Sequence, residues 1–328
     1  MLIKTIHGWE IPESQVTPED VFINRRQLML QMGGAGLGLI GLGAMGNQAR
    51  AATDPDPTLS YYPASKNPKF LDAGRAITPE KLNTTYNNFY EFGTSKRISR
   101  AAQALKIRPW EIKIDGEVDK PMTIGFDDLL KKVKLEERVV RHRCVEAWAM
   151  TVPWTGFMLK DLIAIAKPNS NAKYVQFQTF KDPEMAPGQK PPLFGKGLPW
   201  PYTEGLTMAE AMNDLTFMVT GAYGKPVANS MGAPLRMHCP WKYGFKSAKS
   251  INRITFTSKR PVGFWEALQG TEYGFWANVN PEVPHARWSQ AQERLLDTGK
   301  KVPTKMFNGY GEYVAHLYKD LQGEVLYR

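Results

Sequence analysis

Alternating hydrophobic and polar residues predict several short β-strands along the chain. Residues 110–114 alternate with a period of two and lead into Asp115-Gly116, a common turn pair. Residues 138–143 also predict a strand, which ends at Cys144, and residues 172–180 alternate again as a strand. Short hydrophobic runs also predict strands over residues 217–220, 235–239 and 251–257.

Helical spacing of hydrophobic residues is less common in this chain. Residues 157–166 repeat at the helical period and stop before Pro168, where a helix would end. Residues 123–130 predict a short capped helix, and residues 288–296 form an amphipathic segment. Short strands interrupted by short helices, without regular strand–helix alternation, are typical of α+β folds. We therefore predict one mixed α+β domain over residues 86–328, because no internal repeat or linker divides it.

Two segments lack any sustained periodicity. Residues 52–85 carry several prolines, which predicts an extended N-terminal arm along the surface. Residues 183–201 are rich in proline and glycine, which predicts a long loop. Loops of this length inside a compact domain are usually functional.

The N-terminal segment carries an export pattern. Arg25-Arg26 precede an uncharged stretch over residues 27–49, which closes with the small-residue site Ala49-Arg50-Ala51. This pattern predicts a cleaved twin-arginine signal peptide over residues 1–51, and therefore export of a folded protein to the periplasm by the twin-arginine machinery. The alternative is a membrane-spanning helix, which needs about 20 apolar residues. Seven glycines and four amide side chains in the stretch disfavour it.

Composition and charge narrow the class of partner. The formal net charge is +10, and the chain has two cysteines, Cys144 and Cys239. A basic surface suits an anionic cofactor or an anionic membrane face, although it also serves general solubility. The lysines are dispersed instead of forming a tract, so we expect no nucleic-acid partner for an exported protein. Two cysteines are too few for the disulfide framework of many small secreted proteins.

Cys144 is the first candidate for chemistry, because it ends a predicted strand directly after Arg141-His142-Arg143. Neighbouring positive charge lowers the pKa of a thiol and favours the thiolate, which attacks electrophiles or binds soft metals. Charged flanking residues also make full burial costly, which argues against a purely structural cysteine. A nucleophile paired with histidine and a metal ligand both remain open. His238 and Cys239 point to opposite faces of their strand, and we expect Cys239 in the core.

Two further segments have side chains suited to a ligand. Arg236, Lys242, Lys246 and Lys249 alternate with aromatic residues and a glycine, a pattern that suits a phosphate but also a solvated loop. Residues 87–93 are rich in side-chain donors and acceptors that could bind the polar edge of a heterocycle. A capped turn packed on two phenylalanines would explain the same residues.

These segments together resemble a known family. The matching segments are the twin-arginine leader, Tyr-Asn-Asn-Phe-Tyr-Glu-Phe-Gly at 86–93, Arg-Cys-Val-Glu-Ala-Trp at 143–148, Pro-Trp-Lys-Tyr-Gly-Phe-Lys at 240–246, Tyr-Gly-Phe-Trp-Ala-Asn-Val-Asn-Pro at 273–281 and Arg-Trp-Ser-Gln-Ala at 287–291. In this order they resemble the catalytic subunits of the periplasmic protein-methionine-sulfoxide reductases, which are molybdopterin enzymes of the sulfite oxidase fold family. The resemblance runs from about residue 20 to near the C-terminus.

The resemblance implies a single mixed domain of the sulfite oxidase molybdopterin-binding type and one Mo-molybdopterin per chain. It implies reduction of methionine sulfoxide in oxidised periplasmic proteins, by oxygen-atom transfer to molybdenum. Electrons would come from the quinone pool through a membrane haem b subunit, since no dinucleotide or haem-attachment motif is visible in the chain. The cofactor would carry the redox chemistry, and the protein would position it.

The resemblance also implies roles for individual residues. Cys144 would be the protein ligand of molybdenum, and Glu146 and Asn88 would lie near the metal. The pterin and its phosphate would be held by Asn87, Tyr90, Glu91, Thr179, Met231, Arg236, Ser247, Ala248 and Lys249. Met231 stands where the family pattern has an asparagine, so its backbone would make that contact. A disulfide would remove the metal ligand, and we therefore predict that both cysteines are unpaired.

Two other functions are compatible with these features. A sulfite dehydrogenase of the same fold would need a tight anion pocket and usually a haem partner, and the chain has no Cys-x-x-Cys-His haem-binding motif. An exported binding protein for an anionic solute would explain the basic charge and the aromatic loops without catalysis. A binding protein of this kind would have no need for export in the folded state. We therefore expect a molybdenum-dependent oxidoreductase.

Overall fold

The computed structural model of the 328-residue chain describes residues 56–192 and 197–328. The predicted signal peptide, residues 1–51, lies outside these ranges, and so does part of the predicted 183–201 loop. Within the described ranges, no helix combines the length and the apolar character that crossing a membrane requires.

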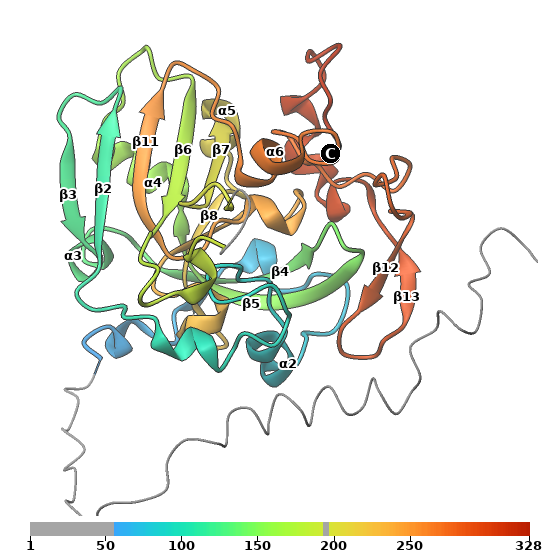
Figure 1. Ribbon diagram of the computed structural model, residues 1–328, viewed down its shortest axis with the longest axis horizontal. Helices are drawn as coiled ribbons and strands as arrows, with labels where there is room; N and C mark the ends of the chain where they lie inside the picture. The colour runs from blue at the N-terminus through green and yellow to red at the C-terminus, as the bar shows by residue number, and fades with distance from the viewer. Residues whose placement is uncertain (1–55, 193–196) are drawn as a thin grey trace, which may run out of the picture. The chain divides into compact units, whose positions relative to one another are not determined.

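Two β-sheets form the centre of the described structure (Figure 1). The larger sheet contains β1 (Ser65–Lys66), β4 (Glu136–Arg143), β5 (Trp148–Met158), β8 (Phe217–Ala222), β9 (Lys225–Pro226), β10 (Arg236–His238), β12 (Gln292–Leu295) and β13 (Lys301–Pro303). The smaller sheet contains β2 (Glu111–Gly116), β3 (Met122–Gly125), β6 (Tyr174–Thr179), β7 (Thr203–Thr207) and β11 (Ile251–Thr257). The strand orders are β1-β4-β5-β12-β13, with β8 joining β5 to β9 and β10, and β3-β2-β11-β6-β7.

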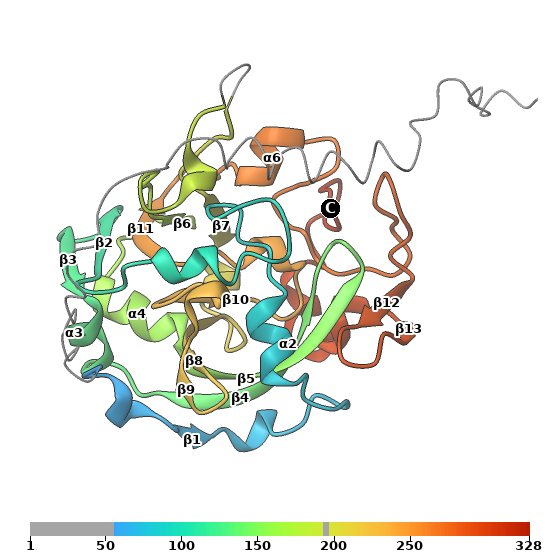
Figure 2. The same ribbon diagram turned by 60° about the horizontal axis from the view of Figure 1, so that its bottom comes forward.

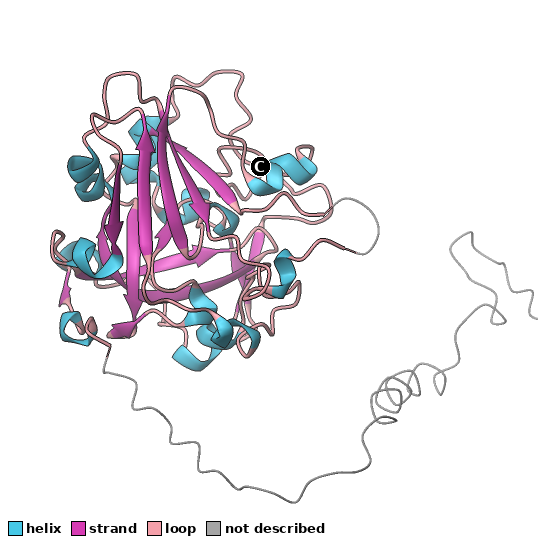
Figure 3. Cartoon of the chain, turned by 60° about the vertical axis from the view of Figure 1, so that its left-hand side comes forward, coloured by secondary structure: helices cyan, strands magenta, loops and turns pink. Residues whose placement is uncertain are grey.

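The helices are short and lie around the two sheets (Figure 3). The α-helices are α2 (Glu80–Thr85), α3 (Phe126–Leu130), α4 (Leu159–Ala166), α5 (Met208–Ala211), α6 (Phe264–Gln269) and α7 (Gly311–Val314). The 3-10 helices are η2 (Leu59–Tyr61), η3 (Pro68–Phe70), η4 (Ala101–Ala104), η5 (Pro187–Gln189), η6 (Asn229–Met231), η7 (Gly244–Lys246), η8 (Met306–Gly309) and η9 (Ala315–Leu317). Mixed sheets with short, irregularly placed helices are the predicted α+β arrangement.

The β4–β5 hairpin positions the cysteine of interest. Its register runs from Glu136 opposite Gly156 to Arg143 opposite Ala149, which leaves residues 144–147 as the connecting turn. Residues 148–157 of β5 are all buried, because β4 and β8 pair along its two edges and the core covers its faces. A strand buried on both faces has a nearly continuous hydrophobic sequence, as β5 does. Cys144 therefore begins the turn of a hairpin whose second strand is buried along almost its whole length.

Residues of the predicted N-terminal arm extend the larger sheet. β1 pairs in parallel with the start of β4, and Figure 2 shows it at the edge beside that strand. Phe70 is buried against the core, and the Arg75 side chain donates to the carbonyl of Met150 in β5 at 3.1 Å. These contacts fix the segment to the domain along much of its described length.

One hydrophobic cluster joins the two sheets. It contains fully buried residues of the larger sheet, such as Val152 and Phe157, and of the smaller sheet, such as Phe177 and Ile254. Figure 3 shows that the strands of the two sheets run in clearly different directions. The shared cluster makes the described residues one α+β unit, as the hydrophobic pattern predicts.

The strand predictions over residues 138–143, 172–180, 217–220, 235–239 and 251–257 are confirmed, with small shifts at the ends. Two element predictions are partly wrong. Residues 123–125 belong to β3, because Thr123 pairs with Lys113 of β2, and the helix begins only at Phe126. Residues 157–158 complete β5, so that helix α4 begins at Leu159.

The predicted turn at Asp115-Gly116 is also wrong. β2 continues through both residues, because they pair in parallel with Thr255 and Phe256 of β11. Gly116 has φ +89, and a Cβ at this position would lie 2.0 Å from the carbonyl oxygen of Phe256. The glycine therefore allows the close approach of β2 to β11, and the chain reverses toward β3 only after it.

Candidate active site

The four-residue turn between β4 and β5, residues 144–147, is called the Cys144 turn here. The Cys144 N–H donates to the Trp148 carbonyl at 2.9 Å, and the Cys144 carbonyl accepts from the Ala147 N–H at 3.1 Å. Ala147 has φ 59, a left-handed conformation that costs about 1 kcal/mol or more for a residue with a side chain. Such a conformation persists only when the surroundings hold it. The turn is therefore a constrained support for the Cys144 side chain.

Cys144 lies in the wall of an open cavity with an empty volume of about 780 Å³. Its other walls come from the 87–91 loop, β10, the 244–249 segment and helix α6. The lining residues are Asn87, Asn88, Tyr90, Glu91, His142, Cys144, Val145, Glu146, Trp148, Met150, Tyr202, Arg236, Gly244, Phe245, Ser247, Ala248, Lys249, Trp265 and Tyr273. Segments that are far apart in the sequence thus meet at one site.

Ten of the twelve site residues expected from the sequence line this cavity. The two that do not line it are Thr179 and Met231, and each contacts a residue that does. The Thr179 hydroxyl donates to Glu91 Oε1 at 3.2 Å, and the Met231 carbonyl accepts from Arg236 Nη1 at 2.7 Å. The Met231 carbonyl thus binds Arg236, and its contact with the pterin stays a prediction.

Beside the thiol, Glu146 is the centre of a polar cluster. Asn88 Nδ2 donates to Glu146 Oε2 at 3.0 Å, and Trp148 Nε1 donates to the same oxygen at 3.1 Å. Both Asn88 Nδ2 and Glu146 Oε2 lie 3.6 Å from Cys144 Sγ. Burial opposes ionisation, but the hydrogen bond from Asn88 and the charge of Lys96 lower the pKa of Glu146 below its ordinary value. Glu146 is therefore an anion at neutral pH.

Lys96 completes this cluster, although nothing in the sequence pattern indicates it. Its ammonium forms an ion pair with Glu146 and donates to the Asn88 side-chain oxygen. Lys96 follows Asn88 by eight residues in a loop without periodicity, so only the folded chain brings the two together. Donors from Asn88 and Lys96 consequently meet next to the thiol.

The opposite part of the cavity presents unpaired donors. Arg236 is 3% exposed, yet its Nε has no hydrogen-bond partner among the described residues, and neither has the buried Ser247 Oγ. Burial lowers the pKa of Arg236 only to about 10, so it stays a cation at neutral pH. Its guanidinium also lies 5.0 Å from the ring centre of Trp154, and this cation–π interaction stabilises the positive charge. A buried cation beside an unpaired hydroxyl is suited to an anionic group.

The second basic segment of the sequence divides into two kinds of lysine. Lys249 lines the cavity with Arg236, whereas Lys242 and Lys246 are fully buried elsewhere. Lys242 Nζ pairs with Glu210 at 2.5 Å, and Lys246 Nζ pairs with Glu204 at 2.6 Å. The hypothesis of one phosphate cradle with four cations is therefore wrong for Lys242 and Lys246, because internal carboxylates neutralise both.

Glu91 and Lys249 are oppositely charged residues that both line the cavity, and each influences the pKa of the other. Burial raises the pKa of Glu91, and burial together with the charge of Arg236 lowers the pKa of Lys249. Lys249 Nζ lies 5.8 Å from the ring centre of Phe89, and no protein hydrogen bond to it occurs among the described residues. The Lys249 nitrogen therefore lines the cavity without a protein hydrogen-bond partner among the described residues, and an anionic ligand there would favour its protonated form.

The expectation of a lowered thiol pKa is wrong for the protein alone. Burial raises the pKa of the Cys144 thiol to about 12, and the Glu146 carboxylate adds to this effect. Lys96 and Arg143 act in the opposite direction but do not compensate. Burial was expected to be costly, yet Cys144 is 4% exposed and Arg143 0% exposed, because Arg143 pairs with Glu293 at 3.0 Å. The thiolate therefore requires a further positive charge, such as a bound metal ion.

The two cysteines are unpaired, as predicted, and Cys239 belongs to the hydrophobic core. His142 is a lining residue that sequence reasoning did not select. Its Nδ1 lies 3.3 Å from His238 Nε2, and burial lowers the pKa of both histidines well below the ordinary value. A Cβ on Gly244 would lie 2.6 Å from the His142 ring, so the glycine allows this close packing.

Aromatic residues form much of the remaining wall. Trp265 lies between Tyr90 and Tyr273, with ring centres 5.0 Å and 5.2 Å away. Tyr273 belongs to a segment that the family resemblance includes, whereas Trp265 and Tyr202 carry no sequence signal of their own. Such residues become visible only when the fold brings helix α6 to the cavity.

The cavity chemistry fits the cofactor expected from the family resemblance. Arg236 Nε and Ser247 Oγ are unpaired donors for a phosphate, and Cys144 is a soft ligand whose proton a metal would displace. Among the described residues, no three His, Cys, Asp or Glu side chains converge as a metal cluster. A metal held through one thiolate and the sulfurs of a pterin agrees with this donor set.

Comparisons with known proteins agree with the site. The family described as the oxidoreductase molybdopterin binding domain matches residues 100–265, which confirms the predicted fold class. The chain is 47% identical, over 98% of its own length and 98% of the relative, to the protein-methionine-sulfoxide reductase catalytic subunit MsrP of Burkholderia mallei (strain ATCC 23344).

Among solved structures, the sulfane dehydrogenase SoxCD from Paracoccus pantotrophus matches with 15% identity and a TM-score of 0.43. The match covers 69% of this chain and 57% of that chain, so the present chain spans little more than half of the solved one. The full-length relative and the family match are more informative. The chain therefore belongs to the molybdopterin-binding oxidoreductases, in the family of the protein-methionine-sulfoxide reductase catalytic subunits, and is a molybdenum-dependent enzyme with Mo-molybdopterin as its cofactor.

Proposed function

We propose that this chain reduces methionine sulfoxide in proteins back to methionine. The observation that carries the proposal is its 47% identity, over 98% of the chain, to a protein-methionine-sulfoxide reductase catalytic subunit. The open cavity supports it, because methionine sulfoxide on a protein is polar and needs an accessible site. Tyr90, Trp265 and Tyr273 line this cavity and suit a flexible, sulfur-containing side chain.

Bound Mo-molybdopterin supplies the two-electron oxygen-atom chemistry, and the protein binds and orients the reacting groups. In this proposal Cys144 is the protein ligand of the metal. Arg236, Ser247 and Lys249 hold the phosphate with charged and neutral donors. Asn87, Tyr90, Glu91 and Ala248 line the pterin, and Thr179 and Met231 act by holding Glu91 and Arg236.

The polar cluster beside Cys144 has a separate role. A sulfoxide oxygen is a strong hydrogen-bond acceptor, and the Asn88 amide is a donor 3.6 Å from the thiol sulfur. Lys96 is a second donor in the same cluster. Glu146 keeps both in place through its ion pair and hydrogen bond. We assign Asn88 and Lys96 to binding of the sulfoxide oxygen, and Glu146 to their orientation.

The proposal includes how the enzyme is delivered and reduced. Residues 1–51 are the cleaved twin-arginine signal peptide, residues 52–85 the N-terminal arm and residues 86–328 the catalytic domain. The protein works in the periplasm on oxidised periplasmic proteins. A membrane haem b subunit passes electrons from the quinone pool to the molybdenum centre. The relative's name supports a partner subunit, since it describes that protein as a catalytic subunit.

The test compares substrates with the purified, molybdenum-loaded enzyme and a reduced dye as electron donor. Oxidised protein and free methionine sulfoxide should each reoxidise the dye at a rate proportional to enzyme concentration. Sulfite, offered with an oxidised dye, should give no turnover. Sulfite oxidation without sulfoxide reduction would contradict the proposed function and leave the family assignment unchanged.

A further inference from the structure

The segment Arg-Trp-Ser-Gln-Ala at 287–291 has no role in the site as described so far. Its side chains nevertheless reach the Cys144 turn across a sequence gap of more than 140 residues. Trp288 Nε1 donates to the Val145 carbonyl at 2.7 Å, and Gln290 Nε2 donates to the same oxygen at 2.9 Å. Two side-chain donors therefore converge on one backbone oxygen next to the cysteine.

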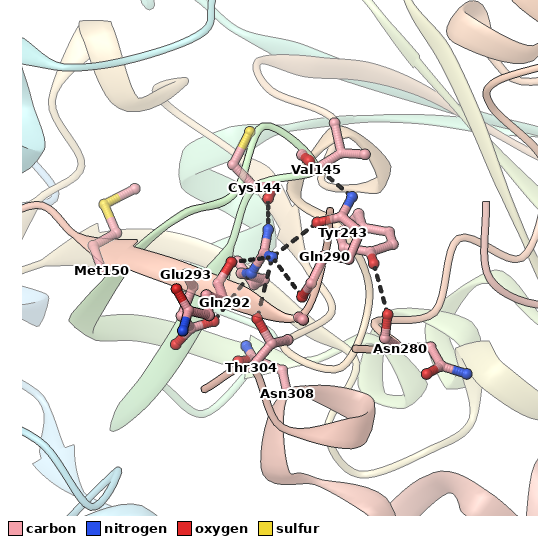
Figure 4. A network of polar contacts seen from close by, with 12 residues as sticks. Cys144, Val145, Met150, Tyr243, Asn280, Gln290, Gln292, Glu293, Thr304 and Asn308 are labelled. Atoms are coloured by element: carbon pink, nitrogen blue, oxygen red, sulfur yellow. Dashed lines mark hydrogen bonds and ion pairs between the residues drawn. The ribbon is translucent and has the colours of Figure 1, made fainter. Parts of the chain in front are cut away.

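Arg143 holds the adjacent carbonyl from inside the protein. It is 0% exposed, and its Nη1 donates to the Cys144 carbonyl while its Nη2 donates to Gln290 Oε1 at 2.8 Å. Figure 4 shows the carbonyl of Cys144 directed toward this network and the sulfur directed away from it. Gln290 thus joins both contacts, since its amide accepts from Arg143 and donates to Val145.

Residues of strand β12 also bind the Cys144 turn and Arg143. The Arg294 N–H donates to the Ala147 carbonyl at 2.9 Å, and Glu293 Oε2 pairs with Arg143 Nε at 3.0 Å. Glu293 is 2% exposed and also pairs with Arg75, so it neutralises two cations in the interior. Three carbonyls of the Cys144 turn are held by side chains or backbone outside the turn. The strained φ of Ala147 shows that the turn needs such support.

We propose that Arg143, Trp288 and Gln290 form a positioning unit that fixes the direction of the Cys144 thiolate toward molybdenum. This inference rests on the proposed role of Cys144 as the metal ligand. Residues that orient a metal ligand typically affect metal affinity or activity by about 10–100-fold when they are replaced. The hydrogen bonds from Arg143, Trp288 and Gln290 to the Cys144 and Val145 carbonyls connect the unit directly to the turn.

The variants Gln290→Leu and Arg143→Lys test the unit. Gln290→Leu keeps the volume but removes both hydrogen bonds, and Arg143→Lys keeps the charge beside Glu293 but loses the forked donors. Arg138→Lys is the matched control, because Arg138 lies on the same strand, is 3% exposed and pairs with Glu136. Each variant is measured for turnover, for melting temperature and for the electron paramagnetic resonance spectrum of partly reduced molybdenum.

We expect Gln290→Leu and Arg143→Lys to shift the molybdenum spectrum and to lower turnover by about tenfold or more. Arg138→Lys should lower the melting temperature with the spectrum unchanged. Trp288→Phe removes one donor and keeps a ring; it is measured alongside the other variants and replaces Arg143→Lys if that variant does not fold. Unchanged spectra in Gln290→Leu and Trp288→Phe would overturn the inference. An unchanged spectrum in Cys144→Ser would instead contradict the ligand role itself.

Discussion

Arg143 directly precedes Cys144, yet its guanidinium binds backbone carbonyls and Glu293 in the interior. The cations that face the cavity are Arg236 and Lys249, about a hundred residues away. Burial raises the pKa of the Cys144 thiol more than the charges of Lys96 and Arg143 lower it. In the proposed function, a bound metal ion supplies the positive charge that stabilises the thiolate.

Ser247 and Ser250 lie in one short segment, and variants of the two test cofactor binding and protein stability separately. Ser247 Oγ is buried without a partner, whereas Ser250 Oγ donates to the Ala233 carbonyl at 2.6 Å. We predict that Ser247→Ala weakens cofactor retention about tenfold, because it removes a hydrogen bond to a charged group. Its melting temperature without cofactor should stay unchanged. Ser250→Ala should do the reverse, with normal retention and about 1 kcal/mol lower stability.

Cofactor content after gel filtration and thermal melts of the cofactor-free proteins provide the two readouts. Equal cofactor retention in both serine variants would remove Ser247 from the proposed anion site.

Glu146 provides a prediction about turnover. Glu146→Gln keeps an oxygen for Trp148 and Asn88 but removes the charge that holds Lys96. We expect about tenfold or more loss of turnover with normal molybdenum content, since the residue does not contact the anion site. Glu272→Gln is the control, because Glu272 also belongs to an ion pair, with Arg287, but does not line the cavity. Turnover equal to that of the control would contradict the orienting role of Glu146.

At the scale of secondary-structure elements, buried ion pairs fasten helix α5 to the segment after β10. Glu210 accepts from Tyr318 at 2.7 Å and pairs with Lys242, which also donates to the Trp276 carbonyl. We predict that Glu210→Gln lowers the free energy of unfolding by about 3–5 kcal/mol, because Lys242 is left as an unpaired buried charge. The exposed pair of Glu80 and Lys225 is the control, and Glu80→Gln should cost at most about 1 kcal/mol.

The same pair predicts a pH dependence of stability. Burial opposes ionisation of Glu210, but Lys242 lowers its pKa below the ordinary 4.5. A lowered folded-state pKa means that the stabilisation is complete above pH 4.5 and is lost as the pH falls through the folded value. The stability difference between wild type and Glu210→Gln, from denaturant unfolding of cofactor-free protein, should therefore shrink in acid. A difference that grows as the pH falls would contradict the assignment.

Local patterns were sufficient for most strands but not for the contacts between distant segments. The sequence of residues 138–143 predicts β4, and the structure confirms it as a largely buried strand that ends at Arg143. It cannot indicate that β12, about 150 residues later, pairs beside β5 and supports the Cys144 turn. The turn predicted at Asp115-Gly116 failed for a similar reason, since pairing with β11 outweighs local turn preference.

Some residues of the candidate site could be predicted from the sequence, and others are placed there only by the fold. Cys144 and Arg236 carry a chemical signal in the sequence, and the family resemblance supplied their partners. Lys242 and Lys249 have the same residue type and comparable neighbours, so only the positions of Glu210 and Arg236 distinguish them. Lys96 and Trp265 reach the cavity through loop and helix placement, which no periodic pattern encodes.

At the scale of the whole molecule, the cavity draws on segments from residue 87 to residue 273. No single element forms it, so cofactor binding depends on a completed fold. An enzyme of this kind has to be assembled where the cofactor is available, which agrees with the proposed export of folded protein. The net charge of +10 suits an anionic cofactor and anionic client surfaces, although the charge alone does not select them.

The central claim is that protein methionine sulfoxide is reduced at a molybdenum bound through Cys144. The most direct measurement is the rate of dye reoxidation by oxidised protein with wild type, Cys144→Ser and Cys239→Ala. We predict at least about a hundredfold loss of rate in Cys144→Ser and a near-normal rate in Cys239→Ala, with both variants folded. A full rate in Cys144→Ser would contradict the claim.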